Sequence, residues 1–172
     1  MGGAPARGWQ PWRLLDLAEG VLDRSEDGEG RVRKVFEQAV QDLGAVAVAV
    51  AVAAQVEPLA LAEQAAETLE ENGYGQLDGL IGALAPALGT VGLQHLRARF
   101  HGAAAHGPTV NLALQEIADA LGDVDGYIAR FDAQDRLQPG IAAGIARRLL
   151  TAARPAEALA ALEAAAATAL RR

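Results

Sequence analysis

A glycine-rich segment at residues 70–89, EENGYGQLDGLIGALAPALG, has the composition of a loop that could bind a phosphate. A dinucleotide-binding loop places G-x-G-x-x-G between a strand and a helix, so that backbone N–H groups at the helix start face the phosphate. From Gly73 to Gly79 the spacing is instead G-x-G-x-x-x-G, after an acidic helical segment. A P-loop also needs a lysine after its last glycine, and the only lysine is Lys34. We therefore expect no phosphate site here.

The glycines of this segment are better explained as helix punctuation. Gly73 is predicted to end the preceding helix, and Gly75 to loosen the turn that follows. Gly79 and Gly82 are predicted to lie inside the next helix, where the absence of a side chain lets another helix approach closely. The segment then connects two helices and has no chemistry of its own.

A second stretch, DRSEDGEG, resembles the start of an EF-hand calcium loop. Asp23, Ser25, Asp27 and Gly28 match positions 1, 3, 5 and 6 of that loop. The last position of the loop must be a bidentate glutamate, and in this chain it is Lys34. We therefore predict a solvated linker without a calcium site.

Nucleophilic and metal-assisted chemistry lacks candidate residues. The chain has no cysteine and one serine, Ser25, which lies outside any G-x-S-x-G motif. His95, His101 and His106 do not share the i, i+4 spacing of a helical zinc pair, and no Glu-x-x-His is present. We expect neither a metal nor another cofactor. Carboxylate chemistry stays open, because acidic side chains from different helices can meet in space.

Composition favours an all-α fold. Of the 172 residues, 51% are hydrophobic but only 4% are aromatic, and alanine, the best helix former, is abundant. The net charge of −7 argues against a nucleic-acid partner. Residues 1–128 carry 8 basic and 18 acidic side chains, whereas residues 129–172 carry 7 and 4. This asymmetry leaves open a basic C-terminal face for an anionic partner.

Helical periodicity recurs along the chain. In GRVRKVFEQAVQDLG, six apolar residues from Val32 to Leu43 follow the helical repeat, and Gly44 is predicted to end that helix. The predicted helices are joined by short connections, which favour antiparallel hairpins. Further helix starts are predicted at Pro11, Pro58, Thr90, Thr109, Asp123, Pro139 and Pro155.

The segment AVAVAVAVAA at residues 45–54 alternates two apolar residue types, so it lacks the polar face of a half-buried strand. It is also too short for a membrane span, which needs about 20 residues. We favour a buried helical extension over a loosely ordered connector. Residues 1–10 are predicted to be a flexible leader without a signal peptide, and residues 11–172 a single α-helical domain. With no cysteine, the chain fits a cytoplasmic protein.

The blocks NGYGQLDGLIGALAPALGTVGLQHLRARF, LALQEIADALGDVDGYIARF and GIAAGIARRLLTAARPAEALAALE resemble a bacterial family of α-helical proteins without an assigned function. That family looks like tetratricopeptide repeats, and the resemblance covers most of residues 13–165. It implies stacked helical hairpins, and it implies no activity.

Two classes of function remain after these exclusions. The first is a non-catalytic helical-repeat scaffold that binds a protein or peptide, and it is the one we expect. Its candidate contact residues have an apolar body and a polar tip, or a charge beside such a residue: Tyr74, Asp78, Tyr127 and Arg130. We expect Tyr74 to be exposed and Tyr127 to lie in the core. The second class is a small helical enzyme or ligand-binding protein that uses carboxylate and arginine groups in a pocket. We also expect a homo-oligomer, with residues 45–54 as the candidate interface, and no membrane partner.

Overall fold

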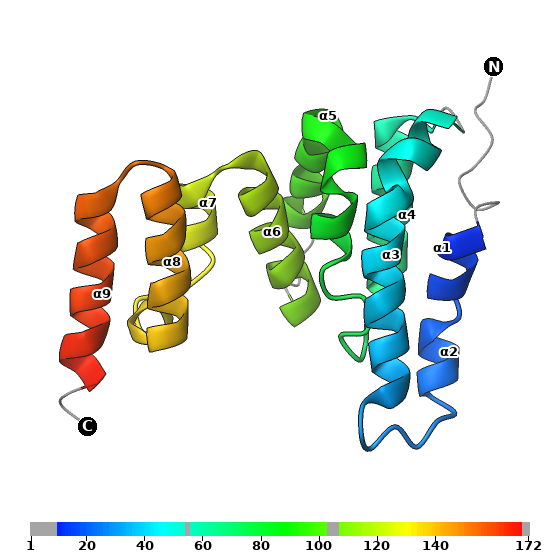
Figure 1. Cartoon of the computed structure of the whole chain (residues 1–172), viewed down its shortest axis with the longest axis horizontal. Coiled ribbons are helices and arrows are strands. Elements are labelled where there is room, and N and C mark those ends of the chain that lie inside the picture. Colours follow the sequence, from blue (N-terminus) through cyan, green and yellow to red (C-terminus); the bar gives the residue numbers. More distant parts are fainter. Residues whose placement is uncertain (1–9, 54–55, 103–106, 170–172) are drawn as a thin grey trace. The chain divides into compact units, whose positions relative to one another are not determined.

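The computed structural model describes residues 10–53, 56–102 and 107–169. Within these ranges the chain forms α-helices and one short 3₁₀ helix, with no strand, so the predicted all-α fold is confirmed (Figure 1). The predicted leader lies almost entirely outside the described residues. The helices are α1 (Gln10–Leu15), α2 (Ala18–Leu22), α3 (Arg31–Ala53), α4 (Pro58–Glu70), α5 (Leu80–Gly102), α6 (Pro108–Leu121), α7 (Val124–Ile128), η2 (Asp135–Leu137), α8 (Pro139–Thr151) and α9 (Pro155–Ala169).

The chain divides into two compact units, residues 1–120 and residues 121–172. The first, called unit 1 here, contains α1 to α5 and nearly all of α6. The second, unit 2, contains α7, η2, α8 and α9. Each unit has its own buried apolar residues, and the interpretation of residues 11–172 as one domain stays a prediction.

Helices α3 and α5, with 23 residues each, are the longest described helices of unit 1, and they pack against each other. Its predicted apolar face is largely confirmed, because Phe36, Val40 and Leu43 are buried. Val35 is the exception, with 58% of its surface exposed. The short helices α1 and α2 cover α3 on another side (Figure 1).

The prediction that Gly44 ends this helix is wrong. Helix α3 continues through Gly44 to Ala53, and Gly44 lies where α5 packs closely against it. A Cβ atom at Gly44 would lie 2.7 Å from Ala83 Cβ and 2.9 Å from the Ala83 carbonyl oxygen. The glycine is therefore required by helix packing and does not mark a helix end.

The alternating segment is helical as far as Ala53, as favoured, but it is not buried as a whole. Ala47 is buried, whereas Val46, Val48 and Val52 are 42%, 45% and 74% exposed. The reason is geometric: at 100° per residue, the valines fall on both flanks of the stripe that Ala47 continues. The helix therefore carries exposed β-branched side chains near its C-terminal end.

Helices α4 and α5 form a hairpin whose connection was partly mispredicted. Helix α4 starts at Pro58 as expected, but it ends at Glu70 with Glu71 as its C-cap, so the prediction that Gly73 ends it is wrong. Gly79, predicted inside the next helix, precedes α5 and has φ +89°, a left-handed conformation that favours glycine. Gly89 interrupts α5 with φ +56° and ψ −175°, next to the predicted helix start at Thr90.

Helix α6 begins at Pro108, so Thr109 lies in its first turn and is not its N-cap. The Thr109 hydroxyl instead donates to the carbonyl oxygen of Asn72 at 3.4 Å, which ties α6 to the end of α4. Leu114 and Ile117 of the predicted stripe are buried.

In unit 2, the predicted N-cap at Asp123 is confirmed, because its carboxylate accepts from the backbone N–H of Gly126 at 2.8 Å. Helices α8 and α9 start at Pro139 and Pro155 as predicted and pack as a hairpin. The 3₁₀ helix η2 was not predicted. None of the described helices combines the length and the apolar character needed to cross a membrane.

Candidate functional site

The loop between α4 and α5 is held by two buried polar side chains. Asn72 is 4% exposed and Gln76 is fully buried. The Asn72 Oδ1 atom accepts from the backbone N–H of Leu77 at 2.8 Å, and Gln76 Nε2 donates to the Glu71 carbonyl oxygen at 2.8 Å. The Gln76 Oε1 atom accepts from the Tyr74 backbone N–H at 3.0 Å. These hydrogen bonds satisfy backbone groups of the loop that would otherwise bond to water, and they fix the position of Tyr74.

Tyr74 and Asp78, both predicted as partner contacts, lie in this one loop. Tyr74 is 51% exposed, as expected, and its hydroxyl donates to Asp23 Oδ1 at 2.7 Å. This hydrogen bond raises the pKa of the Tyr74 hydroxyl. Asp78 is exposed, and its Oδ1 atom accepts a hydrogen bond from Asn72 Nδ2 at 2.9 Å. Asp78 therefore also stabilises the loop. Tyr74 is thus the better contact candidate of the two.

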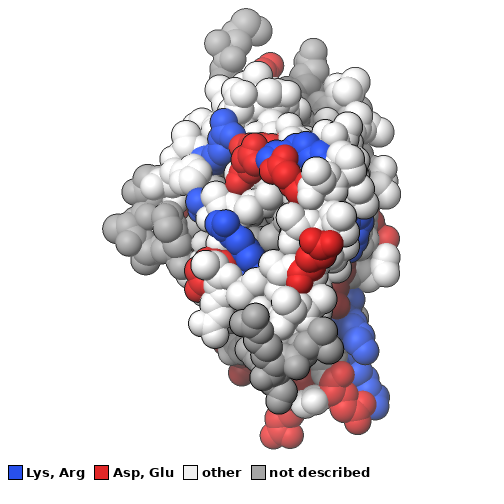
Figure 2. Space-filling model, turned by 90° about the vertical axis from the view of Figure 1, so that its left-hand side faces the viewer, with Lys and Arg blue, Asp and Glu red and all other residues white. Residues whose placement is uncertain are grey.

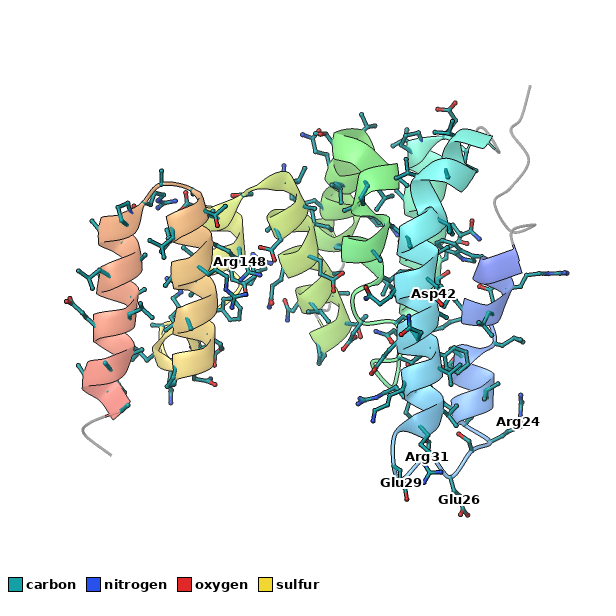
Figure 3. The ribbon with its side chains drawn as sticks, in the orientation of Figure 1. Arg24, Glu26, Glu29, Arg31, Asp42 and Arg148 are labelled. Carbon is teal, nitrogen blue, oxygen red and sulfur yellow. The ribbon has the colours of Figure 1, made fainter. Side chains whose placement is uncertain are left out.

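Tyr74 also borders a hollow of about 520 Å³ at the turn between α2 and α3, with Leu22 and Arg33 on its wall. Side chains of both signs surround this turn, as Figure 3 shows for Arg24, Glu26, Glu29 and Arg31. The wall is completed by Ser25, Asp27, Gly28, Glu29 and Gly30.

The residues that resemble a calcium loop have other roles in the structure. Asp27 caps α3, because its two carboxylate oxygens accept from the backbone N–H groups of Val32 and Arg33, each at 3.0 Å. These bonds lower the pKa of Asp27. Ser25 Oγ donates to the Leu22 carbonyl oxygen, while Asp23 accepts from Tyr74. The resemblance therefore reflects a helix cap within an acidic linker.

The start of α5, where a phosphate would have bound, receives a carboxylate of the chain itself. Glu116 of α6 accepts from the backbone N–H groups of Gly79 and Gly82, each at 2.9 Å. Burial raises the pKa of Glu116, and the two N–H bonds oppose that rise. The helix N-terminus thus binds an anion, but one supplied by α6.

An apolar cleft of about 360 Å³ opens beside the same loop, and we call it the α4–α6 cleft. Leu69 and Phe100 are among its apolar lining residues, and Glu70 stands at its edge with a side chain that is 70% exposed. Gly73 lines this cleft and its neighbour Tyr74 lines the hollow, so the same loop borders both the cleft and the hollow. The described residues that line the cleft are Ala66, Leu69, Glu70, Asn72, Gly73, Phe100, Gly107, Thr109, Val110 and Ala113.

A cluster of charged side chains, called the Glu63 cluster, adjoins this cleft through Glu70. The Glu63 carboxylate contacts both His95 and Arg99 of α5. Arg99 also donates to Glu70 at 3.0 Å. The hydrogen bond with His95, which outweighs the opposing effect of burial, lowers the pKa of Glu63. The cluster joins α4 to α5 and presents a histidine–glutamate pair at the surface.

The other two predicted contact residues, Tyr127 and Arg130, belong to unit 2. Tyr127 is 8% exposed and therefore in the core, as expected. The guanidinium of Arg148, which Figure 3 labels, lies 3.7 Å from the Tyr127 ring centroid. The Phe131 ring meets the Tyr127 ring edge to face, with 5.2 Å between centroids. Arg130 is half-buried in the turn that follows α7. Tyr127 acts in packing, so it is a poor contact residue.

Among the described residues of unit 2, the excess of arginine does not form a purely basic face. Arg154 pairs with Asp125 at 2.8 Å and with Glu157 at 2.7 Å, and these carboxylates raise its pKa. Figure 2 views the α9 side, where basic and acidic atoms lie next to one another on a largely uncharged surface. The observed charges on this side are mixed.

Sequence reasoning missed both the α4–α6 cleft and the Glu63 cluster. Residues from three helices line the cleft, and no local sequence pattern indicates that these helices come together. The cluster had a signal: Glu63 and Glu70 are seven residues apart on one helix, and His95 and Arg99 are four apart on the next. Opposed rows of acidic and basic residues on a predicted hairpin indicate cross-helix ion pairs.

Comparison of the chain with curated proteins and with solved structures gives no match. One family model matches residues 9–111 and residues 103–172, which together include all described residues. The chain therefore belongs to this family, a family of unknown function (DUF6880).

Proposed function

We propose that the protein is a non-catalytic helical scaffold that binds a protein or peptide, and that the α4–α6 cleft of unit 1 is its contact site. The observation that supports this proposal best is an open apolar cleft beside a fixed loop with an exposed tyrosine. Partner recognition often depends on a few aromatic or arginine side chains and on pockets that receive apolar anchors. Tyr74 supplies such a side chain, and the cleft supplies such a pocket.

Rigidity of the loop supports the proposal further. Buried Asn72 and Gln76 hold the loop through hydrogen bonds that do not depend on a partner. A contact surface that is ordered before binding loses less conformational entropy on binding. The loop can thus present Tyr74 and Gly73 without rearrangement.

The Glu63 cluster supports a second candidate, a small helical enzyme or ligand-binding protein. A histidine hydrogen-bonded to a carboxylate is a common acid–base arrangement, and Arg99 could orient an anionic substrate. We rank this candidate second because Arg99 already pairs with Glu63 and Glu70, which suffices to explain the cluster as a link between α4 and α5.

Two further proposals concern assembly. Hairpins such as α4–α5 and α8–α9 fit a tetratricopeptide-like arrangement, in keeping with the bacterial family that the sequence resembles. We also infer a homo-oligomer in which the exposed Val48 and Val52 of α3 contact a second copy, since contiguous exposed apolar side chains favour association.

A cleft-filling substitution tests the proposed function. Val110→Trp would occupy the cleft, and Val91→Trp, at a 60% exposed position of α5 outside the cleft lining, is its matched control. Both variants and the wild type would be immobilised and exposed to lysate of the native cells, with recovered proteins quantified by mass spectrometry. We expect Val110→Trp and Tyr74→Ala to lose a partner that Val91→Trp keeps, with melting temperatures close to wild type. Equal recovery by all variants would refute the contact site.

Turnover provides the test of the second candidate. Purified protein that converts a small-molecule substrate, with the rate lost in His95→Gln and kept in Val110→Trp, would favour the enzyme over the scaffold.

A further inference from the structure

Building on the proposed function, we infer that the segment bound in the α4–α6 cleft carries a lysine or arginine next to its apolar anchor, and that Glu70 pairs with this cation. The inference concerns the chemical class of the partner. It follows from the charges that border the cleft and from the apolar residues that line it.

Glu70 is the carboxylate that the described part of α4 places at the cleft edge, and it shares its cationic partner. Arg99 contacts both Glu63 and Glu70, so one guanidinium is shared by two carboxylates, and His95 also contacts Glu63. Arg99 is 31% exposed, whereas the Glu70 side chain is 70% exposed. A cation that arrives from solvent therefore reaches Glu70 without displacing the more buried Arg99–Glu63 contact.

The position of Glu70 within its helix adds to this attraction. Helix α4 ends at Glu70, and exposed Glu71 is its C-cap. Carbonyl groups at a helix C-terminus carry partial negative charge, so two glutamates there are electrostatically unfavourable. A lysine or arginine of a partner would relieve that repulsion. The wider charge of this part of the chain, 8 basic against 18 acidic residues in residues 1–128, also steers cations toward it.

The interior of the cleft explains why the cation should accompany an apolar side chain. Ala66, Leu69, Phe100, Val110 and Ala113 provide an apolar floor. An apolar anchor placed there is removed from water, and a cation a residue or two away remains at the Glu70 edge, where it keeps part of its hydration. An acidic partner would meet Glu70 and Glu71 as like charges.

Selection from a phage-displayed library of random peptides about 12 residues long tests this inference. We expect wild-type protein to enrich peptides in which lysine or arginine lies within about two residues of a large apolar residue. Glu70→Gln should reduce that enrichment and weaken the best peptide about fivefold by fluorescence anisotropy. The matched control is Glu57→Gln, which removes the same charge at the opposite end of α4, about 20 Å away at 1.5 Å per residue.

The outcomes separate this inference from the proposed function. The inference would be overturned if neutral or acidic peptides were enriched, or if Glu70→Gln and Glu57→Gln weakened peptide binding equally. In either case, loss of peptide binding in Val110→Trp would still support the cleft as the contact site. Selected peptides that bind Val110→Trp as well as wild type would overturn both, and so would the absence of any enrichment.

Discussion

Replacement of Gly44 by alanine tests the closest helix–helix contact of unit 1. The new Cβ atom would lie 2.7 Å from Ala83 Cβ and 2.9 Å from the Ala83 carbonyl oxygen, distances far shorter than normal contact. Because the carbonyl belongs to the backbone of α5, the clash cannot be relieved by a rotamer change, and α3 and α5 must move apart. Overpacking of this kind costs about 1–3 kcal/mol.

An opposing gain must be subtracted from this cost. Alanine stabilises a helix interior relative to glycine by about 1 kcal/mol. The expected net loss is therefore about 0–2 kcal/mol, which corresponds to a fall in melting temperature of up to about 8 °C. Thermal and urea unfolding followed by circular dichroism at 222 nm, the wavelength of helical absorption, provide the measurement.

The control for this substitution is Gly20→Ala in helix α2. The nearest atom to a Cβ there is the flexible end of Arg24, at 3.5 Å, so the helix gains about 0.5–1 kcal/mol without a clash. The melting temperature of Gly20→Ala should therefore lie above that of Gly44→Ala. If Gly44→Ala were as stable as Gly20→Ala, the close packing of α3 on α5 would be refuted.

Three further predictions concern the α2–α3 turn and assembly. Asp27 has a lowered pKa in the folded state, so its stabilising effect is present above about pH 4 and is lost as pH falls through the folded pKa. The melting temperature of wild type should therefore exceed that of Asp27→Asn by less and less between about pH 5 and pH 3. A difference that stays constant over this range would contradict the role of Asp27 as a cap. Calcium at millimolar concentration should give no binding heat in isothermal titration, since Asp27 caps α3 and Lys34 replaces the required glutamate, and a stoichiometric isotherm lost in Asp23→Ala would contradict this. Light scattering should give a mass above the 17.8 kDa of one chain, and Val48→Glu with Val52→Glu should lower it; a monomeric wild type at high concentration would refute self-association.

The sequence predicted helix starts best where backbone geometry alone decides them. Pro58, Pro139 and Pro155 each begin a helix, because proline fixes φ near the helical value and lacks an N–H group that the first turn does not use. Asp123 caps α7 for a similarly local reason.

Glycine was harder to interpret because it serves two purposes. Gly44 was predicted to end a helix and instead allows a close helix crossing, whereas Gly79 was predicted inside a helix and instead precedes one. The residue type is the same in both cases, and the difference depends on which element lies opposite. The sequence of one chain does not show which element packs against a given glycine.

The candidate site depended even more on the fold. Asn72 and Gln76 are polar and sit between helices, which is typical of an exposed loop, yet both are buried because their side chains bond the loop backbone. The α4–α6 cleft combines residues 66–73, Phe100 and residues 107–113. Tyr74 was identified from its residue type and its place after a helix break, which are local properties.

Photo-crosslinking in the native cells tests the central proposal, partner binding in the α4–α6 cleft, most directly. A photoreactive phenylalanine analogue would replace Val110 in the cleft or, as control, the exposed Val91 of α5. Mass spectrometry of the adducts identifies the partner residue that lies in the cleft. We predict an adduct specific to position 110, on an apolar residue with a lysine or arginine within about two positions. Adducts that form equally at positions 110 and 91, or at neither position, would contradict the proposal.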